Sequence, residues 1–309
     1  AQPARATDKM SFRIPDPFGG WMDPKQFMAA SRVLIVAGKG GVGKSTVAAT
    51  LVTAARKLGL SALLVETDGK PLLVDPNDDA GLTARTITPA DALAEYLDGS
   101  GLRRVSRRLI SAGIVDVVAS ASPGIDNLLV LGKIKQLERN NAADLIVVDA
   151  PAAGHALTML RTPRAMADSV AVGPILQQAN DVLSMLNDEK RCQVMLVTLP
   201  ESTPVNETVE TAFSLEEDIG IRLAPLIVNR VDMHAPLEIP EHLDSSSAVV
   251  RAAAFRNARL SSQANALAQL DRRLPLPRLN LALDHSANIA ERADQLIEAI
   301  RRCDTGATS

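Results

Sequence analysis

Residues 33–46 have the sequence Val33-Leu34-Ile35-Val36-Ala37-Gly38-Lys39-Gly40-Gly41-Val42-Gly43-Lys44-Ser45-Thr46. The first five residues form an apolar run typical of a buried strand, and the rest matches G-x-x-x-x-G-K-[S/T], the pattern of a phosphate-binding loop. The glycines of this pattern let backbone N–H groups close around phosphate oxygens at the start of a helix. The stretch therefore predicts a strand, a phosphate loop and a helix in direct succession.

The residues of this loop are expected to contact a bound nucleotide. The expected nucleotide-binding residues are Gly38, Gly40, Gly41, Val42, Gly43, Lys44, Ser45 and Thr46. Lys44 occupies the lysine position of the pattern and is the predicted catalytic cation for the β- and γ-phosphates. Ser45 is the predicted hydroxyl ligand of Mg²⁺. The expected cofactors are therefore ATP and Mg²⁺.

Short apolar runs alternate with helical patterns along the chain. The expected strands are Val33–Ala37, Ala62–Glu66, Val115–Ala119, Leu145–Asp149, Gln193–Leu199, Leu223–Asn229 and Leu276–Leu281. The expected helices are Lys44–Leu58, Ile125–Arg139, Val205–Ile219, Ala248–Leu270 and Ser286–Arg302. Continuous apolar strands are typical of a parallel sheet that is covered on both sides. This order predicts an α/β fold with a doubly wound, mostly parallel sheet and helices on both faces, as in P-loop NTPases.

The two ends of the chain are expected to lie outside this fold. Residues 1–31 contain several prolines and glycines and predict a flexible N-terminal arm, with a short helix near Asp23–Ala30. Residues 32–302 are the expected single ATPase domain, and residues 303–309 are the expected tail. Within the domain, the stretch Leu72–Thr88 is expected to be an irregular loop.

Composition and charge argue against several classes of function. The 309 residues carry a net charge of −3 and only 2% aromatic side chains. We therefore expect no nucleic-acid partner. The two cysteines, Cys192 and Cys303, are far apart in sequence. Two distant thiols cannot supply the three thiolates of a trivalent arsenic or antimony site, so we expect no metalloid site. The low cysteine content and the lack of a long apolar run predict a cytoplasmic protein.

Acidic residues follow two of the expected strands, at the edge where ligands bind in such sheets. Asp149 ends the run Leu145–Asp149 and is the predicted carboxylate that holds Mg²⁺. After the run Ala62–Glu66, either Asp68 or Glu66 could polarise the attacking water. We take Asp68 as the catalytic residue and keep Glu66 as the alternative.

Further residues are expected beside the nucleotide. Gly154 could bring a backbone N–H to the γ-phosphate. The adjacent His155 could couple the phosphate to a partner, or be a surface or capping histidine. Asn229 ends an apolar run, and an amide there can pair with an adenine edge. Arg230 follows it and is expected to contact the same nucleotide.

Several motifs together resemble the family of arsenical pump-driving ATPases, which includes the ATPases that target tail-anchored membrane proteins. The motifs are Gly38–Thr46, Glu66-Thr67-Asp68, Pro123-Gly124-Ile125-Asp126, Asp149–His155, Leu199–Thr208 and Ile227–Arg230, in the family's order. The resemblance implies that Asp68 belongs to switch I, residues 149–155 to switch II and Asn229 to the adenine site. It also implies that Lys39, directly after the first glycine, marks a deviant Walker A loop and acts as a catalytic cation across a dimer interface.

The resemblance further implies a Mg²⁺-dependent ATPase whose dimer switches with the nucleotide to drive transport, targeting or a chaperone-like process. Pump members of the family join two ATPase halves, whereas this chain has one phosphate loop. It is therefore expected to form a homodimer, or a heterodimer with a paralogous ATPase, and to serve a membrane-protein or membrane-associated client through which it reaches the membrane periphery. The alternatives are a positioning or partition ATPase of the Min/Par type, and a nucleotide-binding scaffold that does not hydrolyse ATP.

Overall fold

The computed structural model describes residues 23–69, 83–99, 124–239 and 247–303. Seven strands in this part form one sheet: β1 (Val33–Ala37), β2 (Ala62–Glu66), β3 (Thr83–Thr86), β4 (Leu145–Asp149), β5 (Cys192–Thr198), β6 (Leu226–Val231) and β7 (Arg278–Ala282). Their order is β3-β2-β4-β1-β5-β6-β7, and every neighbouring pair is parallel. The expected strand Val115–Ala119 lies outside the described residues.

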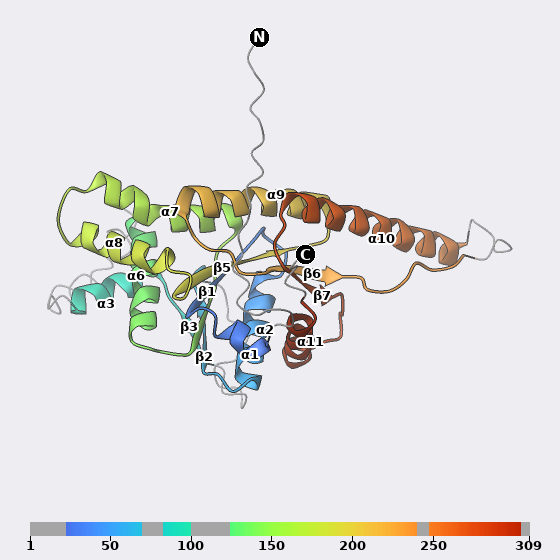
Figure 1. The fold of residues 1–309 in the computed structure, drawn as a ribbon, viewed down its shortest axis with the longest axis horizontal. Coiled ribbons are helices and arrows are strands. Elements are labelled where there is room, and N and C mark those ends of the chain that lie inside the picture. Colours follow the sequence, from blue (N-terminus) through green and yellow to red (C-terminus); the bar gives the residue numbers. More distant parts are fainter. Residues whose placement is uncertain (1–22, 70–82, 100–123, 240–246, 304–309) are drawn as a thin grey trace, which may run out of the picture.

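Helices connect the strands and cover the sheet (Figure 1). They are α1 (Pro24–Met28), α2 (Lys44–Lys57), α3 (Pro89–Gly99), α6 (Ile125–Arg139), α7 (Ala153–Ser169), α8 (Pro174–Leu186), α9 (Ser202–Phe213), α10 (Ala248–Arg273) and α11 (Ile289–Arg301). A π-helical segment, η1 (Ser214–Ile219), continues α9. The expected helix Val205–Ile219 therefore changes its winding after Phe213.

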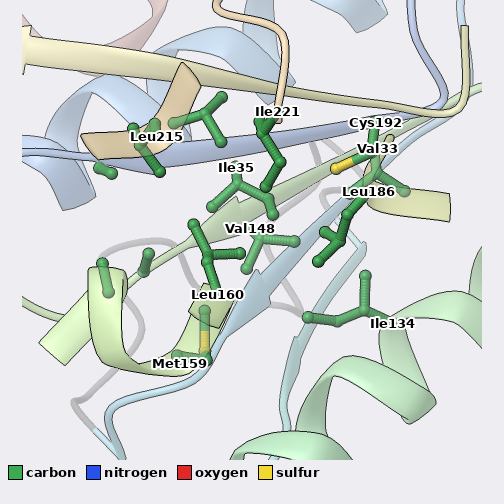
Figure 2. Packing of buried hydrophobic residues seen from close by; sticks show 14 of the residues in the cluster. Val33, Ile35, Ile134, Val148, Met159, Leu160, Leu186, Cys192, Leu215 and Ile221 are labelled. Atoms are coloured by element: carbon green, nitrogen blue, oxygen red, sulfur yellow. The ribbon is translucent and has the colours of Figure 1, made fainter. Parts of the chain in front are cut away.

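Each face of the sheet has its own hydrophobic core, because successive residues of a strand point to opposite faces. Val33 and Ile35 of β1 belong to a cluster with residues of α6, α7, α8 and α9, part of which is shown in Figure 2. Leu34 and Val36 belong to the other cluster, with residues of α1, α2 and α11. The predicted doubly wound α/β sheet with helices on both faces is confirmed.

Part of the predicted secondary structure was wrong. Residues 83–86 of the expected loop Leu72–Thr88 form β3. The sequence has no apolar run there, because three of its four residues are polar and, among the described strands, it pairs only with β2. Three helices, α3, α7 and α8, were not predicted. In α7 the internal Pro163 is buried within the helix. Proline usually ends a helix, and packing against α8 and η1 overrides that local preference here.

Residues at both ends of the described part pack onto the body of the fold. The predicted short helix near the N-terminus is α1, and its Phe27 and Met28 are buried in the cluster that contains α2 and α11. The packed structure thus begins ahead of the expected boundary at residue 32. At the other end, Cys303 is buried in the same cluster, whereas Cys192 is buried on the opposite face. Burial raises the pKa of the Cys192 thiol to about 12.

None of the helices in the described part of the chain is both long and apolar enough to span a membrane.

Candidate functional site

The phosphate loop leaves the sheet at β1, whose neighbours are β4 and β5. The chain winds outward from this point in both directions, so the loop lies at the switch point where α/β sheets bind ligands. Gly38 has a φ of +153°, and a Cβ on it would lie 2.2 Å from the carbonyl oxygen of Val197 in β5. A side chain at residue 38 would therefore push the loop off the sheet.

The helix after the loop begins without a side-chain cap. Its N-cap residue, Gly43, has a left-handed backbone with φ of +95° and, as a glycine, provides no side-chain cap for the first turn of α2. Uncapped N–H groups and the helix dipole together favour a bound anion. Lys44 begins α2, is only 7% exposed and donates from Nζ to the carbonyl oxygen of Lys39 at 3.4 Å. Its ammonium group thus lies within the loop, as phosphate binding requires.

Asn229, at the end of β6, supports this loop directly. Its side chain is buried, and Nδ2 donates a hydrogen bond to the carbonyl oxygen of Val42 at 2.9 Å. A Cβ on Gly43 would lie 2.5 Å from the same Nδ2 atom, so the glycine makes room for the amide. The two residues that bond are 187 positions apart, and no local pattern in the sequence indicates their contact. The predicted adenine contact of Asn229 stays a prediction.

We expect Asn229→Ala to lower the free energy of unfolding by about 1–3 kcal/mol, because the buried carbonyl of Val42 loses its donor. The loosened loop should also bind nucleotide more weakly. Denaturant unfolding and titration with fluorescent ADP measure the two effects. Asn180→Ala, on the exposed surface of α8, is the matched control and should change neither quantity. Unchanged stability of Asn229→Ala would contradict a supporting role for the amide.

Two buried carboxylates end neighbouring strands beside the loop. Glu66 of β2 and Asp149 of β4 are register partners and are 3% and 6% exposed. Glu66 Oε1 accepts the backbone N–H of Asp68 at 2.6 Å. The side chain of Thr67 donates to the carbonyl oxygen of Asp149 at 3.0 Å. Asp68 itself is exposed. The structure therefore brings Glu66, the alternative residue, into the site together with Asp149.

The oxygen atoms of the side chains at the carboxyl ends of these strands suit a hard cation. Asp149 and Glu66 offer carboxylate oxygens, and Ser45, in the first turn of α2, offers a hydroxyl. The second oxygen of Glu66, Oε2, is buried and has no hydrogen-bond partner among the described residues. Oxygen ligands of this kind fit Mg²⁺.

The segment after Asp149 is more regular than predicted. α7 begins at Ala153, so Gly154 and His155 lie in its first turn and not in a loop. The backbone N–H of Ala153 donates to the carbonyl oxygen of Gly38 at 3.0 Å. The amino end of α7 is thereby tied to the phosphate loop, and its first-turn N–H groups lack a described side-chain cap. His155 is exposed, and its role stays open.

Lys39 forms an ion pair within its own chain. Its ammonium group contacts the carboxylate of Glu207 in α9, and both side chains are partly exposed. Exposed pairs of this kind contribute only about 0–1 kcal/mol. Lys39 can therefore leave Glu207 at little cost. The sequence did not indicate this pairing, because the two residues are 168 positions apart.

A cleft of about 640 Å³ opens next to Asn229. It is lined by residues that follow β5, β6 and β7 and by one side of α10, including Pro200, Arg230, Phe255, Arg256 and His285. Arg230 lines this cleft and has a left-handed backbone. Its backbone N–H donates a hydrogen bond to the side chain of Asn229, which in turn bonds to the loop.

Hydrogen bonds and an ion pair join α10, which lines one side of the cleft, to Asp232 after β6. Asp232 accepts hydrogen bonds from His234 and from Arg256 of α10. These bonds, those of His234 first, lower the pKa of Asp232 to about 2. Gln263 of α10 also exchanges hydrogen bonds of 3.0 Å with the backbone of Asp232. These hydrogen bonds join the residues after β6 to α10 on the polar side of the cleft.

Comparison with known proteins gives consistent matches. Residues 31–172 match the family described as anion-transporting ATPase. ATPase BagA of Mycobacterium tuberculosis is 32% identical over 247 residues, which cover 70% of this chain and 68% of that protein. The arsenical pump-driving ATPase of Escherichia coli is 27% identical over 214 residues, or 64% of this chain and 34% of that protein. ATPase get3 of Schizosaccharomyces pombe is 25% identical over 202 residues, which cover 59% of this chain and 60% of that protein.

A phosphate loop between a central parallel strand and a helix, with carboxylates at the ends of neighbouring strands, defines a P-loop NTPase. The matches to known proteins narrow this class. The chain belongs to the anion-transporting ATPase family, whose members include the arsenical pump-driving and get3 ATPases. The predicted family is confirmed, and the match favours its transport and targeting ATPases over the Min/Par alternative. Because the relatives are named ATPases, the non-hydrolysing scaffold is not supported.

Proposed function

We propose that the chain is a Mg²⁺-dependent ATPase that hydrolyses ATP to ADP and phosphate and uses the nucleotide to switch a dimer. In this proposal the triphosphate lies on the loop of residues 38–46, and the adenosine lies in the adjacent cleft beside Asn229 and Arg230. The dimer would drive a transport, targeting or chaperone-like process in the cytoplasm, as a homodimer or with a paralogous ATPase. The client would be a membrane protein or a membrane-associated protein.

One observation carries the proposal: a buried lysine begins the helix after β1, and two buried carboxylates end β4, which is paired with β1, and β2, which is paired with β4. Lys44 and the N–H groups of α2 would bind the β- and γ-phosphates. Ser45 and Asp149 would hold Mg²⁺, which when bound neutralises charge on these phosphates. Asp68 would orient the attacking water, and the first turn of α7 would contact the γ-phosphate through Gly154. Because the backbone N–H of Ala153 is hydrogen-bonded to the loop, loss of that phosphate would change the position of α7.

Two measurements on the full chain test this function. Phosphate release from ATP is followed with Mg²⁺ and with excess chelator, and only the first should show turnover. Sedimentation velocity with ADP and with ADP plus aluminium fluoride, which imitates the transferring phosphoryl group, reports the oligomeric state. We expect the second mixture to enrich the dimer. Full turnover by a chain that stays monomeric would overturn the switching dimer but not the hydrolysis.

Asp149→Asn should reduce turnover on the order of 10- to 100-fold while changing ATP affinity much less, since the amide is a poorer partner for the cation and its waters. Steady-state phosphate release and titration with fluorescent ATP separate the two quantities. Asp144→Asn is the matched control, because Asp144 is exposed, lies at the opposite end of the same strand and accepts hydrogen bonds from Ser61. Equal activity of the two variants would remove Asp149 from the site.

A further inference from the structure

Glu66 is a buried carboxylate that the predicted mechanism does not use. Its side chain is 3% exposed, and its two oxygens differ in their surroundings. Oε1 accepts the backbone N–H of Asp68 at 2.6 Å, whereas Oε2 has no hydrogen-bond partner among the described residues. A buried carboxylate oxygen without a donor costs free energy. Such an atom in a native fold calls for an explanation, and a bound water or ion is one that recurs in native structures.

The sheet places this oxygen in a particular position. Glu66 and Asp149 are register partners in parallel strands, so their side chains leave the sheet on the same face. That face is the one covered by α2, because Leu64 and Val147, two positions earlier in the same strands, pack in the cluster that contains α2. The carboxylates therefore lie on the side of the sheet where α2 begins.

We infer that Glu66 is a second carboxylate of the magnesium site, an assignment that rests on the proposed function. Oε2 accepts a hydrogen bond from a water of the hydrated cation, while Oε1 holds the backbone N–H of Asp68. Mg²⁺ suits this arrangement because it retains several of its waters when it binds to proteins. Glu66 is thus a positioning residue that links the cation to the backbone of the segment carrying Asp68.

The test measures metal affinity and not turnover. Mn²⁺, a paramagnetic substitute for Mg²⁺, is titrated into the full chain with saturating ADP, and the free ion is followed by electron paramagnetic resonance. Glu66→Gln keeps the shape of the side chain and an acceptor for Asp68, but it removes the charge and turns an N–H toward the water. We expect Mn²⁺ affinity to fall on the order of 10- to 100-fold, with unchanged ADP affinity in chelator.

A second buried glutamate provides the matched control. Glu138 of α6 is 8% exposed and is paired with Arg191 at 2.7 Å. Glu138→Gln should lower the unfolding temperature but leave Mn²⁺ affinity unchanged. A fall in Mn²⁺ affinity as large as that of Glu66→Gln would mean that the loss reflects stability alone, and would overturn the inference.

Glu66→Asp keeps the charge and withdraws the carboxylate by one methylene group, so an intermediate Mn²⁺ affinity is expected. This variant carries the test if Glu66→Gln does not fold. Wild-type Mn²⁺ affinity in the folded variant would show that Glu66 is not part of the site. Failure of the wild-type chain to bind ADP at all would overturn the proposed function instead, so the two failures are distinguishable.

Discussion

Lys44→Ala is expected to lower ATP turnover on the order of 10³-fold, because the phosphates lose the closest cation in a site shielded from water. Lys44 is buried within the loop, where its ammonium group already lies beside the carbonyl oxygen of Lys39. Nucleotide affinity should fall as well, since this charge also contacts the phosphates in the ground state. Phosphate release and titration with fluorescent ADP measure the two losses.

The matched control for Lys44→Ala lies at the other end of the same helix. Lys57 is the last residue of α2 and pairs with Asp294 of α11 at 2.7 Å. Lys57→Ala removes the same kind of side chain from the same helix, but far from the loop, and should hydrolyse ATP at about the wild-type rate. Hydrolysis by Lys44→Ala at the rate of this control would show that the loop does not bind the reacting phosphate.

Lys39→Ala is expected to cause the second largest loss of ATP turnover. Mixing this variant with Lys44→Ala subunits shows whether Lys39 acts on the partner's nucleotide. If Lys39 acts on the partner's γ-phosphate as an arginine finger does, its loss should slow turnover on the order of 10³-fold. ATP binding should remain, because Lys44 still serves the chain's own nucleotide. In the isolated chain Lys39 is held by Glu207, so it must exchange this carboxylate for the partner's phosphate.

Mixing Lys39→Ala with Lys44→Ala subunits tests the dimer directly. In a mixed dimer, the Lys39→Ala subunit has an intact loop and receives Lys39 from its partner, so one of the two sites is rebuilt. When equal amounts of the two variants exchange subunits at random, about half of the dimers are mixed and each has one working site of two. About a quarter of wild-type activity should then return. The recovery should grow with protein concentration. No recovery among dimers shown to exchange would mean that Lys39 acts within its own chain or not at all.

Glu207→Gln separates this role of Lys39 from the ion pair seen in the structure. The variant removes the carboxylate but leaves the lysine in place. An exposed pair is worth about 0–1 kcal/mol, so turnover should change by a factor of about five or less. If Glu207→Gln were as slow as Lys39→Ala, the ion pair itself, and not a contact with the partner, would explain the loss.

Secondary structure was predictable where a single local pattern decides it. The central strands are continuous apolar runs because both faces of the sheet are covered, and each was recognised within a few residues. β3 and α7 were missed for the opposite reason. Three of the four residues of β3 are polar, and the strand is the outermost of those that the structure describes. α7 contains Pro163, a residue that usually ends a helix.

The sequence by itself predicted the phosphate loop, because a glycine-rich loop after a buried strand depends only on residues 33–46. It determined the family through several motifs that occur in the family's order. Asp149 was predicted from an equally local pattern, as an acid that ends an apolar run, and its role at Mg²⁺ stays a prediction. Only the tertiary structure decided which distant residues support this chemistry. The contacts of Asn229 with Val42 and of Lys39 with Glu207 join residues more than 160 positions apart. Glu66 lies beside Asp149 only because β2 and β4 pair in one register. Glu66 is buried and Asp68 is exposed, and this difference depends on how the carboxyl ends of the strands are packed.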